Sequence, residues 1–348
     1  MSIRFLEMNS SRRHRLAEIL QFCLWAFSLS LLLAATAVAQ TCYTAEDMEA
    51  ATHAALVGAG KHYFELAGKA DTASLKQSAV ASLAADFASV ETAVKDNQSN
   101  LSGTDPAPRP EFLLKVEGTA PLERAEFLCG VFGKNGQTAN SAEFVIPKLA
   151  PGTYAVVMED ASSPKGPYVV TFVLQQQGPD WKLGGLFIKA TQAAGKDAKW
   201  YADRAHAFKE KGQNHNAWFY FLAARDLAVP VPFMYTQLTD RIFDDSETVT
   251  PTDLPGDGST VDLTAAGKTY KLTALFPWAV GQDFDLIVKY QAADVSDTSK
   301  TFDANMAVIK ALVAKYPEFH DGFAGVVVRA VDPSGKDFGT LAEMKDIK

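Results

Sequence analysis

The stretch that decides the fold is residues 168–189, which read YVVTFVLQQQGPDWKLGGLFIK. Its two apolar runs, Tyr168–Gln175 and Trp181–Lys189, have the β-branched and aromatic composition of strands. Between them stands Gly178-Pro179-Asp180, a sequence typical of turns, so the two runs are predicted to form an antiparallel hairpin. Gly184-Gly185 interrupts the second run and indicates a β-bulge, which would re-aim the side chains that follow.

More strands and two helices are expected before this hairpin. The strands, which show the two-residue period, are predicted over Glu111–Glu117, Ala125–Phe132, Ala142–Ile146 and Thr153–Met158. Thr44 and Asp47 form a capping-box-like start for a first helix, Thr44–Lys69, which ends at Gly68.

The second helix would be capped by Asp71 or Thr72 and followed by a polar loop over Asn97–Pro110. Its apolar residues recur every three or four positions: Leu75, Ala79, Leu83, Phe87, Val90 and Val94. Helices followed by antiparallel strands predict an α+β unit over residues 44–190, with the helices on one face of the sheet.

This region resembles the NTF2-like, cystatin-like cone fold. The residues that carry the resemblance are Val170–Leu174 and Trp181–Leu186, which match the hairpin that closes the sheet in such domains. The resemblance implies a curved antiparallel sheet wrapped around a helix, with an apolar pocket inside. It implies no particular chemistry, because the fold hosts isomerases, dehydratases and binding modules.

A helical hairpin is expected next, over residues 197–241. It resembles a single tetratricopeptide (TPR-like) repeat. The matching positions are Tyr201, Ala205, Phe208, Gly212, Ala217, Phe221 and Ala224, with Pro230 one place beyond the expected proline. A single repeat cannot bury both of its faces, so we expect its many aromatic rings to lie buried between two α+β domains.

Residues 242–258 are predicted to form an acidic linker, and residues 259–348 a small C-terminal α+β domain. Its expected strands are Thr260–Leu263, Thr269–Phe276, Phe284–Tyr290 and Gly325–Val331, and its expected helix is Phe302–Lys315.

The first 39 residues have the three parts of a secretory signal peptide. Arg12, Arg13 and Arg15 precede an uncharged run, Ile19–Ala39, which ends in a small-x-small sequence. Cleavage after Ala39 would place the protein in the periplasm or outside the cell. The run is also long enough to span a bilayer, so an uncleaved membrane anchor is the alternative.

Charge and composition exclude some classes of partner. The signal segment holds four Arg and two Glu, so the remaining 309 of the 348 residues keep 29 of the 33 basic and 39 of the 41 acidic residues. An acidic chain disfavours nucleic acid and, after cleavage, anionic membrane surfaces as partners. An apolar fraction of 47% is ample for packed cores.

Two cysteines remain after cleavage, Cys42 and Cys129. In an oxidising compartment we expect them to form a disulfide. The alternative is two buried, unpaired thiols.

No motif points to chemistry. Gly58-Ala59-Gly60-Lys61 lacks the flanking residues of a phosphate-binding loop, and Ser162 with Lys165 lacks the companion motifs of penicillin-recognising enzymes. His206 and His215 could approach across the helical hairpin, but a pair of surface histidines is the simpler interpretation.

We therefore name no catalytic, cofactor-binding or metal-binding residue. Asp86, Glu91 and Asp160 are the nearest acid–base candidates, and none belongs to a motif. The sequence favours an exported, non-catalytic binding or interaction protein of the cell envelope, whose partner is a small apolar ligand or an envelope protein. The alternative is an NTF2-like enzyme that acts on a small apolar substrate by general acid–base catalysis.

Overall fold

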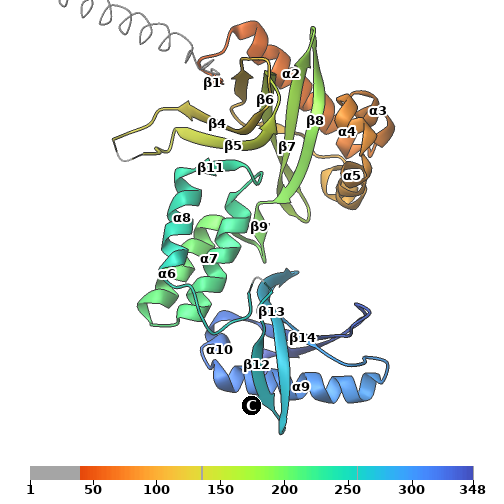
Figure 1. Cartoon of the computed structure of the whole chain (residues 1–348), viewed down its shortest axis with the longest axis vertical. Helices are drawn as coiled ribbons and strands as arrows, with labels where there is room; N and C mark the ends of the chain where they lie inside the picture. The colour runs from red at the N-terminus through yellow and green to blue at the C-terminus, as the bar shows by residue number, and fades with distance from the viewer. Residues whose placement is uncertain (1–39, 135, 257, 348) are drawn as a thin grey trace, which may run out of the picture.

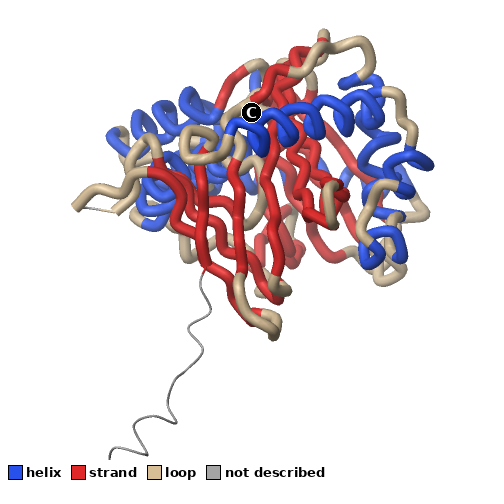
Figure 2. Tube along the Cα trace, turned by 90° about the horizontal axis from the view of Figure 1, so that it is seen from above, coloured by secondary structure: helices blue, strands red, loops and turns tan. Residues whose placement is uncertain are grey.

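The chain is α+β, as predicted, and its parts are stacked along the long axis (Figure 1). The computed structural model describes residues 40–134, 136–256 and 258–347, so the predicted signal segment, residues 1–39, lies outside the described residues. The N-terminal strands and helices lie at one end, the helices of residues 198–247 lie in the middle, and the C-terminal sheet lies at the other end. Seen from above, the strands occupy the middle, with helices on either side (Figure 2).

The N-terminal part contains two sheets where one antiparallel meander was expected. One sheet has the order β1-β3-β6-β7-β8, with β2 also paired to β6, and the other has the order β11-β5-β4. The strands are β1 (Gln40–Thr44), β2 (Ala107–Pro108), β3 (Phe112–Val116), β4 (Leu122–Gly130), β5 (Ser141–Leu149), β6 (Gly152–Ser163), β7 (Gly166–Gln177), β8 (Asp180–Ala190) and β11 (Met234–Thr236).

The second sheet exists because β6 and β7 are apolar on both faces. Residues Tyr154–Glu159 of β6 and Val169–Phe172 of β7 are all buried, as in strands that are covered on both sides. Helices cover one face, around Val157 and Phe172. The three-stranded sheet covers the other face, where Phe127 and Phe144 lie in the core.

The β7–β8 hairpin forms as the sequence predicts, including its bulge. Val173 pairs with Gly185 but Leu174 pairs with Leu183, so Gly184 is the extra residue. Strand β8, which carries the bulge, also explains why the second predicted helix is broken. Val80 donates to the Leu183 carbonyl (2.8 Å) and Leu183 donates to the Ser78 carbonyl (2.9 Å), so residues 78–80 run along β8 instead of continuing a helix.

Four helices result in this region: α2 (Ala50–Gly68), α3 (Thr72–Gln77), α4 (Ala81–Ala85) and α5 (Ala88–Leu101). Asp71 caps α3 as predicted, by accepting from the Ser74 N–H. The expected start at Thr44 is wrong: Thr44 ends strand β1, and its hydroxyl donates to Asp47 (2.7 Å) in a turn before α2. Helix α5 also runs into the segment expected as a polar loop, Asn97–Pro110.

The predicted helical hairpin is α6 (Ala198–Glu210) and α7 (Asn214–Ala228), preceded by the short strands β9 (Gln192–Ala193) and β10 (Lys196–Asp197). Most of its rings are buried: Tyr201, Phe208, Phe219, Tyr220 and Phe221. Trp200 stays 39% exposed and Trp218 is half-buried. The segment expected as a linker, 242–258, starts inside a further helix, α8 (Gln237–Glu247), which Thr236 and Thr239 cap.

The hairpin shares one core with the C-terminal sheet. Phe284 lies 4.9 Å from the Tyr201 ring and 5.1 Å from the Tyr220 ring, between centroids. The sheet has the order β12-β13-β14-β15-β16, and β14 and β15 are parallel. Its elements are β12 (Val261–Ala265), β13 (Lys268–Val280), β14 (Asp283–Gln291), α9 (Thr298–Lys315), α10 (Phe319–Gly322), β15 (Gly325–Val331), β16 (Asp337–Glu343) and a 3-10 turn, Met344–Asp346.

The Cys42–Cys129 disulfide is confirmed, with 5.2 Å between Cα atoms. It joins β1 of the larger sheet to β4 of the smaller one, beside the apolar layer between them. Among the described helices none is long and apolar enough to cross a membrane.

Removing the disulfide should destabilise the protein strongly. The half-cystines are 87 positions apart, and a loop of that size corresponds to about 4–5 kcal/mol on the chain-entropy model. Chemical unfolding of Cys42→Ala/Cys129→Ala, compared with the oxidised wild type, measures the loss. Equal unfolding midpoints for the two proteins would contradict this role.

Gly58 and Gly60 of α2 should respond oppositely to alanine. A Cβ at Gly60 would lie 2.5 Å from Glu159 Oε1 and 2.6 Å from Val157 Cγ1, whereas one at Gly58 would meet nothing within 4 Å. Gly60→Ala should therefore cost about 1–3 kcal/mol of unfolding free energy through overpacking. Gly58→Ala, the matched control, should add about 0.5–1 kcal/mol through helix propensity. Thermal or urea unfolding reports both, and equal effects would show that α2 does not pack closely at Gly60.

Candidate functional site

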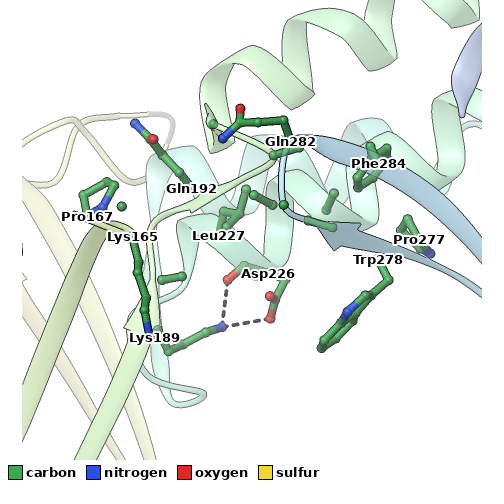
Figure 3. Close-up of a pocket in the computed structure, with 18 of the residues that line it drawn as sticks. Lys165, Pro167, Lys189, Gln192, Asp226, Leu227, Pro277, Trp278, Gln282 and Phe284 are labelled. Atoms are coloured by element: carbon green, nitrogen blue, oxygen red, sulfur yellow. Dashed lines mark hydrogen bonds and ion pairs between the residues drawn. The ribbon is translucent and has the colours of Figure 1, made fainter. Parts of the chain in front are cut away.

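A cleft of about 910 Å³ lies where the three parts of the chain meet (Figure 3). The β6–β7 turn and the end of β8 form one wall, helix α7 forms another, and β13 with the start of β14 forms the third. Its apolar lining includes Pro164, Pro167, Ala193, Leu222, Ala223, Leu227, Phe276, Pro277, Trp278 and Phe284. The volume falls in the range of small-molecule sites.

An ion pair divides this cleft from a second cavity. Lys189 donates to the Asp226 carboxylate (2.8 Å) and to the Asp226 backbone carbonyl (2.7 Å), as Figure 3 shows. Both residues, together with Leu222, also line the second cavity, of about 730 Å³, which extends toward Phe243 of α8. The two cavities therefore form adjoining hollows on either side of one charged contact.

The C-terminal wall of the cleft presents an exposed aromatic ring. Trp278 is 58% exposed, which is unusual for a tryptophan in a strand. Phe284 at the inner end of the same wall is buried against the helical hairpin. This wall thus runs from the buried core at Phe284 to an exposed apolar surface at Trp278, which faces the cleft.

Gly195 lets the turns on two sides of the cleft approach each other. It has a positive φ of 70°, and a Cβ there would lie 2.9 Å from the Gln282 side-chain oxygen. A Cβ at 195 would meet only the end of the flexible Gln282 side chain, so the main constraint on this position is its positive φ.

The interior of the N-terminal part, where the cone-fold resemblance implies a pocket, is packed with side chains. Leu56, Phe64, Phe172 and Leu174 are almost fully buried there. Neither of the two cavities described above lies in this core.

Two buried carboxylates lie at the edge of that core, under helix α2. Glu111 is 2% and Glu159 is 1% exposed, and the Oε2 atom of each is buried without a hydrogen bond. His53 Nε2 lies 3.2 Å from Glu111 Oε2. This contact has the distance of an ion pair without the geometry of a hydrogen bond, because the same oxygen is among those left unbonded.

Burial, together with the nearby carboxylates Glu111 and Asp160, raises the pKa of Glu159 to about 7. Such a group holds a proton near neutrality and would have the pKa of a general acid or base. Gly60 is the reason that it is sealed, because only a residue without a side chain lets α2 approach Glu159 so closely. The sequence did not reveal this pair, because Glu159 lies one residue beyond the predicted strand Thr153–Met158 and Glu111 is the first residue of the predicted strand Glu111–Glu117.

The acid–base candidates taken from the sequence lie elsewhere. Asp86 is exposed after α4, and Glu91 pairs with Lys95 on the surface of α5. Asp160 forms a two-fold contact with Arg109, at 2.7 and 2.9 Å. The structure does not bring these three carboxylates together in one site.

The short motifs considered in the sequence lie in ordinary elements of the fold. Gly58–Lys61 lies inside helix α2, and Ser162 and Lys165 lie at the β6–β7 turn. His206 contacts Asp245 (3.3 Å), while His215 contacts Glu318 and Asp253 (2.8 and 2.9 Å), so the two histidines have different partners. Within the described ranges, no group of three or more His, Cys, Asp or Glu is placed to hold a metal ion.

Comparison with family models, with curated proteins and with solved structures finds no match to this chain. The function is therefore inferred from the sequence and the geometry of the chain itself.

Stability should fall as pH rises through the range in which Glu159 loses its proton. Its pKa is about 7 in the folded state against 4.5 for the unperturbed group, so between these values the folded chain binds more protons than the unfolded one. Unfolding free energy should then drop by about 2–4 kcal/mol from pH 4.5 to pH 7. Glu159→Gln should remove this part of the slope in urea unfolding.

The exposed Glu123→Gln is the matched control and should keep the wild-type slope. An unchanged slope in Glu159→Gln would show that this carboxyl does not titrate in that window.

Proposed function

We propose that the protein is an exported, non-catalytic binding protein of the cell envelope, and that the cleft between its three parts is the binding site. The observation that carries the proposal is the cleft itself: about 910 Å³, mainly apolar, and built from three distant segments of the chain. Ligand sites occur preferentially where structural units meet.

The polar groups of the cleft are better suited to orienting a bound ligand than to catalysing a reaction. Lys189 is already bonded to Asp226, and Lys165 donates to Ser99 (2.8 Å). Nucleophilic catalysis needs a nucleophile held against a base, and these contacts supply a fixed charge instead. An apolar ligand with a small number of polar groups fits this lining best.

Export is supported by the signal segment and by the disulfide. The order of charged, apolar and small residues in 1–39 is that of a signal peptide. The Cys42–Cys129 bridge suits a compartment where disulfides persist. We propose a periplasmic or secreted protein, with an uncleaved anchor as the alternative.

The cone-fold and tetratricopeptide resemblances are part of the proposal. Helices on one face of an antiparallel sheet, and a two-helix hairpin with small residues at Ala205 and Ala217, support them. In this proposal the hairpin joins the two α+β parts and helps to form the cleft, while its inner rings fill a shared core.

The rival function, acid–base catalysis in an NTF2-like domain, has one observation in its favour, which is the Glu111–Glu159 pair with His53 beside it. A substrate would need a cavity next to these carboxylates, and the two cavities described above are lined by other residues. The binding proposal therefore has the stronger geometric support.

Native mass spectrometry of the protein purified from its own envelope should show a retained molecule. Ala223 of α7 lines the cleft, so Ala223→Trp should fill it and remove the added mass. Asn214→Trp, at the exposed start of the same helix and outside the cleft, is the matched control and should retain the molecule.

The same spectrum tests export, because cleavage after Ala39 gives a chain that starts at Gln40. A wild-type protein that carries no added mass would count against the binding function. An added mass that persists in Ala223→Trp would place the ligand elsewhere.

A further inference from the structure

The cleft follows the edge of a strand and not its face. Side chains of successive strand residues point to opposite faces of a sheet, yet four consecutive residues of β13, Phe276 to Ala279, all line the cleft. One edge of β13 is covered by β14 as far as Val280. The cleft therefore runs along the other edge.

On that other edge, the second half of β13 has no partner strand. Strand β12 pairs with β13 only from Lys268 to Leu272. In the part of the chain that the structure describes, no strand pairs with residues 275–280 on that side. Six residues of strand, about 20 Å at 3.3 Å per residue, have no partner strand on this edge, and four of them, Phe276 to Ala279, line the cleft.

The register shows which backbone groups face the cleft. Val280 and Asp283 flank the two-residue turn Gly281-Gln282, so they form a hydrogen-bonded pair. Bonded and non-bonded pairs alternate along an antiparallel ladder. Trp278 and Phe276 therefore bond to β14, and the residues between them turn their backbone groups to the open side.

Leu275 and Ala279 each turn an N–H donor and a C=O acceptor to the open edge, and Pro277 turns only its C=O there. Of these three residues, Pro277 and Ala279 line the cleft, and Leu275 lies just beyond its lining. Among the described residues none donates to or accepts from these groups in a turn or loop contact. Because Pro277 lies in a non-bonded pair, it costs no bond to β14 and removes one donor from the open edge. Proline on an edge limits indiscriminate pairing.

The rest of the cleft suits the side chains of an extended segment. Leu222 and Leu227 of α7 form the apolar wall opposite β13, and the Trp278 ring is exposed beside the edge. Lys165 and Lys189 against the single carboxylate of Asp226 leave a net positive charge. This charge favours a ligand that carries a carboxylate.

We propose that the cleft binds an extended, mainly apolar peptide segment that carries a carboxylate and adds to the open edge of β13 as a further strand. Alternating donors and acceptors at strand spacing are matched by the backbone of another strand, whereas a compact small molecule would leave most of them unpaired. The inference rests on the proposed function, because it assigns a ligand class to the same cleft.

The test uses a phage-displayed library of short random linear peptides, selected on the full exported chain, and a synthetic peptide of the selected sequence. Amide hydrogen exchange then reports the mode of binding. With the peptide bound, the amides of Leu275 and Ala279 should exchange about tenfold more slowly or better, as hydrogen-bonded amides do. The amides of Phe276 and Trp278, already bonded to β14, should change little.

Ala279→Pro provides a second measurement, because it removes an N–H from the open edge and leaves the ladder to β14 intact. Peptide affinity should fall about tenfold, as expected for loss of one hydrogen bond. Thr264→Pro is the control: by the same register argument it removes an outward N–H from β12, which lies outside the cleft. It should keep the wild-type affinity.

Peptide binding without slower exchange at Leu275 and Ala279 would overturn strand addition and leave the cleft as a binding site. Failure to select any peptide would overturn the peptide class. In that case a retained small molecule in the native mass spectrum would keep the proposed function, and an empty spectrum would remove it as well.

Discussion

The two central strands of the N-terminal sheet, β6 and β7, must be covered on both faces, and the rest of that part follows from this constraint. Val157 and Phe172 point to one face and Val156 and Val169 to the other, and all four are buried. At about 25 cal/mol per Å² of apolar surface, leaving either face in water would remove much of the stability of the domain. Helices α2 to α5 cover one face and the β4–β5–β11 sheet covers the other. Because β11 comes after the helical hairpin in sequence, covering the second face also ties the hairpin to the N-terminal part.

The cleft is a consequence of this arrangement. The hairpin is fixed to the N-terminal part by β11 and by the contact of Lys189 with Asp226. On its other side Tyr201 and Tyr220 pack on Phe284, which fixes the C-terminal sheet. Both α+β parts are held by the helices more than by each other, so a hollow remains between them. Its walls are apolar surfaces that are not buried in the neighbouring hydrophobic cores.

Much of the fold could be predicted from the sequence, because local patterns carry it. The turn at Gly178, the bulge at Gly184 and the helices α6 and α7 were all visible, since each depends on residues close together in the chain. The errors occurred where a distant partner decides the structure. A continuous helix through Ser78–Val80 satisfies the apolar spacing, but the bulged strand offers hydrogen bonds that the spacing does not show. The cleft could not be predicted at all, because its lining comes from segments around positions 165, 225 and 278 that no periodicity connects.

Two of the places where the chain departs from a packed, satisfied interior differ in accessibility, and this decides which of them can meet a partner. At Glu111 and Glu159 the unbonded oxygens are buried, and α2 closes over Glu159 at Gly60, so only a proton or a water molecule could reach them without movement of the helix. Burial of these carboxylates costs free energy, and its effect within the protein is that the Glu159 carboxyl keeps its proton near neutrality. At β13 the unpaired backbone groups lie beside an exposed tryptophan and an open cleft, where water satisfies them until something replaces it. Water on an open strand edge is exchanged at little cost, whereas opening a core to reach a buried carboxylate costs many apolar contacts. Binding is therefore favoured at the cleft beside β13. The buried pair Glu111 and Glu159 mainly affects the stability of the protein.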